Sequence, residues 1–327
     1  MNSKERILAA WNGQAVDHIP LTTWCFGFPA PPGLQWQIDG VDRPFWYSLR
    51  MEHIHTLPQP WTLADEFQRV LAWRQLGVDD VLDISPPWST HPDVRWEDQL
   101  LPAGKNDPCP LAIRQYHTPL GELRHAVRLT GEAPGAGWVI QPEQVFLFED
   151  FNIPRGAKHL VASPEEIPAV SALYQAPNAM AQAAYRQRME QVSAWARQEN
   201  VPVQAWSAFG MDGVVWLTGV QNALFLALDA PQAFQELVEI IFKADLARTE
   251  LALATPGVDL IVQRGWYSST NFWSPRLFER FVFPYLQALA ALVHRHQRKL
   301  GYVMTTGVQE LGPRLADAGV DVLYFAD

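Results

Sequence analysis

The chain has 327 residues, of which 48% are hydrophobic and 18% are charged. This composition supplies a sizeable core and excludes an intrinsically disordered chain, which needs low hydrophobicity and high charge. The 25 basic and 35 acidic residues give a net charge of −10, and no run of Lys or Arg occurs. The sequence therefore argues against nucleic acid or an anionic membrane surface as a partner.

The sequence carries no signal for secretion or membrane insertion. The N-terminal segment MNSKERILAAW is polar and charged and lacks the apolar stretch of a secretory signal. No apolar run approaches the roughly 18 residues that a membrane span requires. The two cysteines, Cys25 and Cys109, are too few for a disulfide framework or a four-thiolate metal site. We therefore expect a cytoplasmic protein with no membrane partner.

The first half of the chain predicts two helix–strand units and one irregular region. A helix is expected over Ser3–Trp11 and a strand over 19–26, before the Pro-rich loop FPAPPG. Apolar residues at helical spacing over 62–76 predict a second helix, and VDDVLDI predicts a strand over 79–84. Residues 89–150 hold short alternating runs separated by Gly and Pro, which indicates an antiparallel excursion inserted in a loop.

The second half alternates regularly between helix and strand. Strands are predicted at 201–207, 258–264, 301–306 and 320–326, and helices at 178–199, 213–228, 232–255, from Ser274-Pro275 onward, and over VQELGPRLADAG. Three times a Gly-Val-Asp step leads from a helix into a strand. Near-continuous apolar strands between helices are typical of a parallel sheet covered on both faces. Six strands suit either a doubly wound sheet or a (β/α)8 barrel that lacks two units, and periodicity alone leaves both open.

Five segments, in this order along the chain, carry a family resemblance: KERILAAWNGQAVDHIPL, GVDDVLDI, VWLTGVQNALFLALDAPQ, SPRLFERFVFPYLQALAALVHRHQRK and GYVMTTGVQELGPRLADAGVDVL. Together they resemble the uroporphyrinogen decarboxylase superfamily, which includes a tetrapyrrole decarboxylase and corrinoid-linked methyltransferases that act on small methylated compounds. The resemblance implies a single (β/α)8 TIM barrel domain over residues 1–327, with 89–150 as an excursion after the second strand. It also implies that two βα units are missing, so we expect a fragment of a longer polypeptide. The alternative is a partner subunit, such as a second copy in a homodimer, that covers the gap.

On such a barrel the chemistry lies where the strands end at the C-terminal face. The candidate site residues that follow strands are Trp24, Asp83, Trp88, Asp212, Trp216, Arg264, Trp266, Tyr267 and Thr306. Asp83, in the apolar stretch VLDIS, matches the aspartate with which the decarboxylase holds pyrrole nitrogens. We expect Asp83 to act as a polar anchor or as an acid/base. The alternative is a strand-end carboxylate that is satisfied by backbone amides or that caps the next helix.

The segment QRGWYSSTNFW, after the strand predicted at 258–264, combines a cation with aromatic and hydroxyl side chains. Arg264 suits bidentate binding of a carboxylate, and Tyr267 suits donation of a proton or a hydrogen bond. With Trp24, Trp88 and Trp216, these aromatic residues are expected to line a pocket for a small flat acid. The alternative is a packed loop anchored by its tryptophans.

Two motifs of the resembling families are absent. The segment TTWCFGFPAPPG has no Arg where the decarboxylase carries a twin-arginine segment, so a polyanionic tetrapyrrole would find few cationic partners. Where the methyltransferases have the zinc ligands His-x-Cys, this chain has Met304 and Thr306, which are poor zinc ligands. A corrinoid is expected only through a partner protein. His294 and His296 form a pair without a third ligand on the polar end of a helix.

We therefore expect an enzyme of this superfamily that acts on a small organic substrate. Corrinoid-linked methyl transfer or demethylation is slightly favoured over tetrapyrrole decarboxylation, because the arginine segment is missing. A non-catalytic barrel that binds a small molecule is the third hypothesis. No cofactor motif is evident, and zinc remains an option only if other residues replace the missing ligands.

Overall fold

The computed structural model describes residues 1–22, 37–38, 41–42, 63–105, 107–129, 147–148, 152–304 and 306–324. The candidate residue Trp24 and most of the strand predicted over 19–26 lie outside these ranges. The described part of that predicted strand, residues 19–22, has no strand conformation.

A five-stranded parallel sheet organises the described chain. Its strands are β3 (Leu82–Ile84), β8 (Val203–Ala208), β9 (Leu260–Gln263), β10 (Lys299–Val303) and β11 (Val322–Tyr324). They lie side by side in the order of the sequence, with all four neighbouring pairs parallel. A doubly wound sheet reverses its strand order at a switch point, whereas the wall of a barrel does not. The strand order thus favours a TIM-like barrel over the doubly wound alternative.

Helices connect and cover these strands. They are α1 (Ser3–Trp11), α2 (Leu63–Gln75), α3 (Asn152–Arg155), α4 (Ile167–Leu173), α5 (Ala179–Glu199), α6 (Met211–Thr218), α7 (Val220–Asp229), α8 (Pro231–Ala254), α9 (Pro275–Phe281), α10 (Phe283–Arg295) and α11 (Val308–Ala318), with 3₁₀ turns η3 (Pro164–Glu166) and η4 (Trp266–Ser268). Within the described ranges no single helix is long and apolar enough to span a membrane. Only α6 and α7 together have the length and composition, and they meet at a bend of 104°.

The helix predicted over 213–228 is instead two helices, divided at Gly219. Gly219 has a φ of 72°, which L side chains rarely adopt. A Cβ there would lie 2.3 Å from Nε2 of His159, so the position has no room for a side chain. The helix predicted after Ser274 is likewise divided, into α9 and α10, at Val282.

Side chains alternate between the two faces of the parallel sheet. On one face Trp206, Leu260, Val262 and Val303 form a small buried cluster, which we call the inner cluster. The intervening residues, such as Ile261 and Leu300, belong to the large apolar core that the sheet shares with the helices. This alternation is the period of 2 expected of a strand. A small apolar interior and a large helix-covered exterior suit the wall of a barrel.

The Gly-Val-Asp steps seen in the sequence have a common structural role. Gly77, Gly257 and Gly319 have φ values of 80°, 102° and 94°, and the last two follow α8 and α11 at their ends. In the second and third steps the Asp that follows binds the start of a neighbouring strand. Asp259 donates its N–H to Val203 O (2.8 Å), and its carboxylate accepts the N–H of Val203 (2.9 Å). Asp321 makes the same two bonds with Leu300 (2.9 and 2.8 Å), so each aspartate fixes the strand register at the N-terminal end of the sheet.

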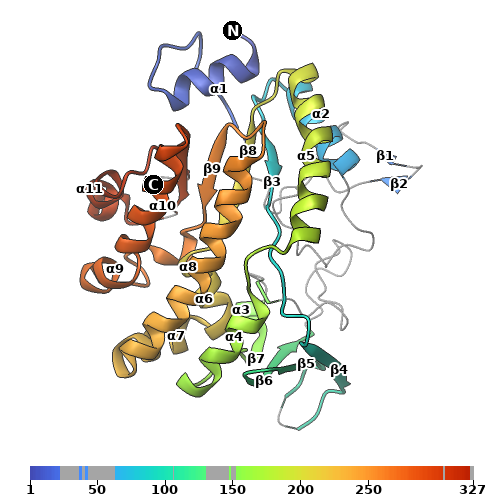
Figure 1. Ribbon diagram of the computed structural model, residues 1–327, viewed down its shortest axis with the longest axis vertical. Helices are drawn as coiled ribbons and strands as arrows, with labels where there is room; N and C mark the ends of the chain where they lie inside the picture. Colours follow the sequence, from blue (N-terminus) through green and yellow to red (C-terminus); the bar gives the residue numbers. More distant parts are fainter. Residues whose placement is uncertain are drawn as a thin grey trace.

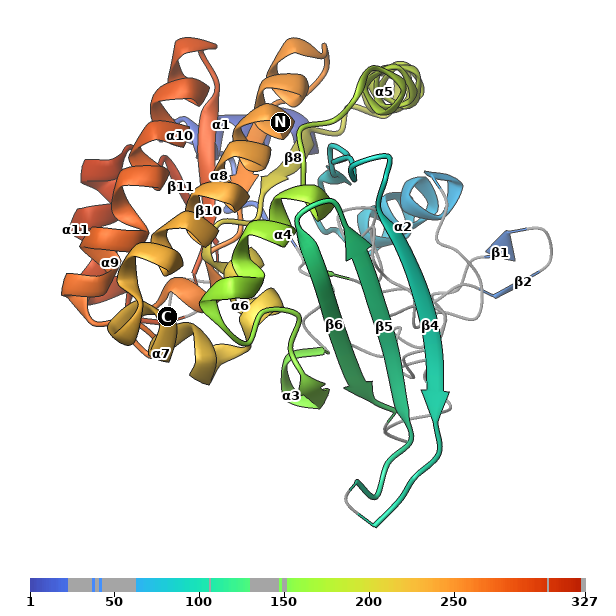
Figure 2. The ribbon, with the colours of Figure 1, turned by 60° about the horizontal axis from the view of Figure 1, so that its bottom comes forward.

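A four-stranded antiparallel sheet follows β3 along the chain. Its strands, in order, are β4 (Arg95–Leu101), β5 (Leu111–Thr118), β6 (Gly121–Arg128) and β7 (Gly156–Lys158). The first three lie in the region predicted to be an antiparallel excursion, whereas β7 lies beyond its predicted end at residue 150. A separate two-stranded pair joins β1 (Gln37–Ile38) and β2 (Val41–Asp42). Figure 1 shows the antiparallel sheet at the end of the molecule opposite α1, and Figure 2 shows its long strands beside α3 and α4.

Candidate functional site

A buried ion pair lies where β8 and β9 end. Asp212 is in the first turn of α6, which follows β8, and Arg264 directly follows β9. Arg264 Nε donates to Asp212 Oδ2 at 3.0 Å, and the Arg264 backbone N–H donates to Ala208 O at 2.9 Å. Asp212 is fully buried and Arg264 is 4% exposed. Both charges are therefore held in one geometry at the C-terminal face, where barrel enzymes place their chemistry.

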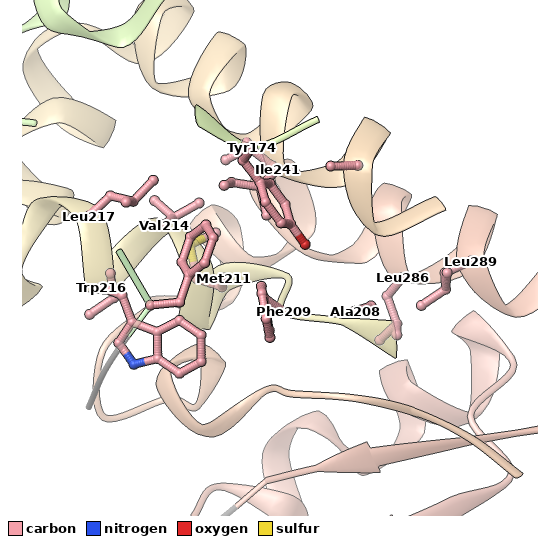
Figure 3. Close-up of a cluster of buried hydrophobic side chains, with 14 of the residues drawn as sticks. Tyr174, Ala208, Phe209, Met211, Val214, Trp216, Leu217, Ile241, Leu286 and Leu289 are labelled. Carbon is pink, nitrogen blue, oxygen red and sulfur yellow. The ribbon is translucent and has the colours of Figure 1, made fainter. Parts of the chain in front are cut away.

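Trp216 supports this pair from α6. Its ring centroid lies 4.7 Å from Arg264 Cζ, within the range of a cation–π contact. The indole is fully buried, and Figure 3 shows it among apolar side chains that include Phe209 and Met211. The sequence predicted Trp216 as the wall of an open substrate pocket. In the structure Trp216 contacts the guanidinium and also packs against Phe148 and Phe209.

The turn after β9 is built against the same carboxylate. The backbone N–H of Tyr267, in η4, donates to Asp212 Oδ1 at 2.9 Å. The Tyr267 ring packs edge-on against Phe272, with centroids 5.5 Å apart, and remains partly exposed. Its neighbour Trp266 packs against the inner cluster. Asp212 thus orients both Arg264 and the turn that carries Tyr267.

Tyr302, which sequence reasoning missed, supports the turn from β10. Its hydroxyl is hydrogen-bonded to Ser268 Oγ, and Ser268 Oγ also donates to Gly265 O (2.7 Å). A Cβ at Gly265 would lie 2.2 Å from Tyr302 Cζ, so only glycine lets the ring approach this closely. Burial raises the pKa of Tyr302 above its ordinary value, with a further contribution from the charge of Asp212, so the phenol remains neutral.

The end of β10 does not offer zinc ligands among the described residues. Met304 is fully buried and belongs to the large helix-covered core, so its thioether is packing material. Thr306 accepts a hydrogen bond from Asn271 Nδ2 (2.9 Å) and donates to Ser269 Oγ (3.1 Å). The described chain also holds no group of three or more His, Cys, Asp or Glu that could bind a metal. A buried thioether and a hydrogen-bonded hydroxyl do not fit a zinc ion.

Asp83 lies in a different place from the Asp212–Arg264 pair. It is in the middle of β3, 1% exposed, on the inner face of the sheet. Its Oδ1 accepts hydrogen bonds from Gln204 Nε2 (2.5 Å) and Trp206 Nε1 (2.8 Å), both from β8. Gln204 Oε1 in turn accepts from the Tyr324 hydroxyl (2.5 Å). Asp83 therefore links β3 to β8 inside the sheet, and Gln204 extends this network to Tyr324 of β11.

The guanidinium of Arg69 lies among three buried carboxylates, one of which is that of Asp83. Arg69, from α2, binds Glu66 (2.7 Å) and Asp80, and its Nη2 lies 3.8 Å from Asp83 Oδ2. Burial raises the pKa of Asp80 to about 7, and the charges of Asp83 and Glu66 act in the same direction, against the opposing effect of Arg69. The carboxyl group of Asp80 is therefore protonated for part of the time near neutral pH.

A second buried network, on α8, holds the loops after β3 and β8. Asp245 Oδ2 accepts the N–H groups of Phe209 (3.0 Å) and Gly210 (2.8 Å), which form the turn after β8. Arg248 donates to Pro86 O and Ser85 Oγ, both at 2.9 Å, in the loop after β3. The two residues are joined by the Tyr174 hydroxyl, which donates to Asp245 (2.6 Å) and accepts from Arg248 (2.9 Å).

This network also accounts for the predicted residue Trp88. Arg248 Cζ lies 5.5 Å from the Trp88 ring centroid and 4.3 Å from that of Phe209. Trp88 also packs edge-on against Phe148 and Tyr174. The sequence of α8 contains a pattern that indicates this network. Asp245, Arg248 and Thr249 share one helix face with the apolar Ile241 and Ala252, and a charged pair on an apolar stripe indicates a buried network.

The structure thus divides the predicted site residues into groups. Asp212, Trp216, Arg264 and the Tyr267 turn come together, with Trp266 adjacent. Thr306 follows β10 at the same face, and Trp88 lies in the aromatic packing around Arg248. Asp83 lies within the sheet, where it binds Gln204 and Trp206 of β8.

Comparison with known proteins identifies the family. The family model described as uroporphyrinogen decarboxylase (URO-D) matches residues 164–327, which is half of the chain. A methyltransferase from Methanosarcina mazei aligns with 99% of this chain and 75% of its own, at 16% identity and a TM-score of 0.49. No curated protein matches the chain. The matched half contains β8–β11 and the Asp212–Arg264 pair, and the chain belongs to the uroporphyrinogen decarboxylase family.

Proposed function

We propose that this chain is an enzyme that binds a small organic anion at the C-terminal ends of β8–β10, with Arg264 as the substrate-facing cation. The observation that carries the proposal is the buried Asp212–Arg264 pair at 3.0 Å. Burying two charges costs free energy, which a well-placed ion pair offsets only in part. The carboxyl ends of barrel strands are where enzymes of this fold place their active sites, so we interpret the pair as functional. Asp212 and Trp216 fix the plane of the guanidinium, which suits recognition of a planar carboxylate.

The reaction that we favour is methyl transfer or demethylation of a small methylated acid. A corrinoid carried by a partner protein would supply the methyl acceptor or donor. In this assignment Arg264 binds and orients the substrate's acid group. Tyr267 supplies a hydrogen bond, or the proton that the substrate heteroatom takes up when its methyl group leaves. The absence of arginine from TTWCFGFPAPPG supports this reaction over decarboxylation of a polyanionic tetrapyrrole.

The test incubates the purified protein with reduced cobalamin and a panel of methoxy-, methylamino- and methylthio-acids. Formation of methylcobalamin is followed by absorbance. Arg264→Lys keeps the charge but loses the planar fork, and we expect kcat/KM to fall about 10- to 100-fold. Arg276→Lys, at the exposed start of α9, is the matched control and should change kcat/KM less than twofold.

Equal activity of the wild type and the Arg264→Lys variant would contradict the role of Arg264. Conversion of uroporphyrinogen to coproporphyrinogen would replace methyl transfer with decarboxylation. Binding of the methylated acids without turnover in either assay would support the non-catalytic barrel.

A further inference from the structure

A pocket lies at the end of the parallel sheet where the strands begin. Its volume is about 620 Å³. The walls come from α1 with Trp11 and Asn12, from the end of α10 with His294 and Arg298, and from the first residues of β10 and β11 with Lys299 and Asp321. The Asp212–Arg264 pair is at the other end of these strands. We propose that this pocket binds a small organic anion with a flat ring, at a site separate from the substrate site.

The charges around the pocket favour an anion. Asp259 and Asp321 are already engaged, because each carboxylate accepts a backbone N–H from a strand start. Asp259 also binds Lys4 (2.9 Å), and Asp321 also binds His294 Nε2 (2.8 Å) and lies 3.6 Å from Lys299. The lining therefore holds two carboxylates that already have partners and two cations, Arg298 and Lys299.

Arg298 is the cation that an anionic ligand would meet. Its Nε donates to Val258 O (3.0 Å) and its Nη1 approaches Gln297 O (3.4 Å). Both acceptors are backbone carbonyls, and within the described ranges no carboxylate pairs with Arg298. The guanidinium is therefore oriented by the main chain while its charge is not neutralised, which is the arrangement that a carboxylate or phosphate group requires.

The backbone before Arg298 is held in an unusual conformation. Gln297 has a φ of 55°, in the left-handed region that favours glycine. Its N–H donates to His294 O (2.9 Å), and the Arg298 N–H donates to Val293 O (3.2 Å), which ends α10 in a Schellman motif. Glycine is the usual residue at this position. This tight turn places Arg298 and Lys299 at the mouth of the pocket.

The apolar part of the lining indicates what the rest of the ligand should be. Trp11 packs against the inner cluster and also lines the pocket, and Leu8 lies beside it. An indole provides a flat apolar surface that stacks on an aromatic ring. The chemistry of the walls thus selects an aromatic carboxylate or aromatic phosphate monoester, with its acid group on Arg298 and Lys299 and its ring on Trp11.

Isothermal titration calorimetry with phenyl phosphate tests the proposal, with benzoate as the carboxylate probe and inorganic phosphate as the probe without a ring. We expect phenyl phosphate to bind more tightly than inorganic phosphate. Arg298→Gln should raise the Kd for phenyl phosphate at least tenfold. Arg295→Gln removes the same charge from the exposed end of α10 outside the pocket lining, and should change the Kd less than twofold.

Trp11→Leu should weaken the binding of phenyl phosphate and leave that of inorganic phosphate unchanged. Circular dichroism checks that each variant folds, and if Trp11→Leu does not fold, the two arginine variants still decide. The proposal is overturned if no probe binds at millimolar concentration, or if Arg295→Gln weakens binding as much as Arg298→Gln. Equal affinity for phenyl phosphate and inorganic phosphate would also overturn the ring contact.

Discussion

At the scale of single residues, His125 is a buried base with no compensation for its charge. It is on β6, fully buried, and neither ring nitrogen has a hydrogen-bond partner in the described chain. Burial lowers the pKa of His125 to about 3, and the nearby charges of His159, Lys158 and Arg114 act in the same direction. The imidazole is therefore neutral in the folded protein at any pH near neutrality.

This pKa predicts a specific acid sensitivity. Between about pH 6.5 and 3 the unfolded chain binds a proton at His125 that the folded protein does not, so the free energy of unfolding falls as the pH is lowered. From pH 7 to pH 5 we expect His125 to contribute a loss of about 2 kcal/mol. Urea unfolding at pH 7 and pH 5 measures this loss in the free energy of unfolding. The His125→Leu variant should lose less of it between the two pH values than the wild type does.

His117→Gln, on the neighbouring strand β5, is the control for a partly exposed histidine. It should retain the full pH dependence of the wild type. If His125→Leu retains it as well, the acid sensitivity arises elsewhere in the molecule.

At the scale of elements, the Gly-Val-Asp steps connect a short sequence pattern to strand register. The glycine follows the helix in a left-handed conformation, and the valine comes next. The aspartate then binds the start of the neighbouring strand, as Asp259 and Asp321 do. Asp259 binds Val203 and Asp321 binds Leu300, so the same device is used twice along the sheet. A parallel strand that slipped by one residue would exchange its two faces, and these bonds oppose that slip.

The bond between Asp321 and Leu300 predicts how much stability is lost when one carboxylate is removed. Asp321→Ala leaves the N–H of Leu300 without its acceptor at the start of β10, and we expect the free energy of unfolding to fall by about 1–3 kcal/mol. Asp321→Asn keeps a carbonyl oxygen and should cost less. Urea denaturation monitored by circular dichroism gives both values.

Asp317→Ala removes an exposed carboxylate from α11 only four residues earlier and serves as the control, with an expected change under 0.5 kcal/mol. Equal losses for Asp317→Ala and Asp321→Ala would show that charge, not the strand bond, matters.

At the scale of the whole molecule, α1 closes one end of the inner face of the sheet. It is fixed there by Lys4, which binds Asp259, and by Arg6, which binds both Asp17 and Asp79. Trp11 then covers the inner cluster of Trp206, Leu260, Val262 and Val303. Figure 1 shows α1 at this end of the sheet. Asp212 and Arg264 follow β8 and β9 at the opposite ends of the strands.

We expect Trp11→Ala to lower the free energy of unfolding by about 2 kcal/mol, because it uncovers apolar side chains and leaves a gap at the end of the sheet. The same substitution at Trp96, which is 54% exposed on β4, is the control and should cost less than half as much. Chemical denaturation of the two variants compares them. A cost at Trp96 equal to that at Trp11 would argue against the closing role of α1.

The sequence by itself determined the local structure and the family. Helical periodicity and glycine stops predicted the helices around 3–11, 62–76 and 178–199 to within a residue or two, because these signals act over a few neighbouring residues. Family-like segments led to the uroporphyrinogen decarboxylase family, which the family model over residues 164–327 supports. The rule that chemistry follows strand ends also singled out Asp212 and Arg264, which the structure brings together at 3.0 Å.

Only the tertiary structure decided which polar side chains share a site. Asp83 is one residue from the end of its strand, and the sequence could not show that Gln204 and Trp206 bind its carboxylate within the sheet. Arg248 is more than 160 residues from Ser85 along the chain, yet it donates to it. The strand order also separated a barrel wall from a doubly wound sheet, which have the same periodicity. Contacts of this kind depend on how elements that are far apart in the sequence pack together. Local sequence patterns carry no information about that packing.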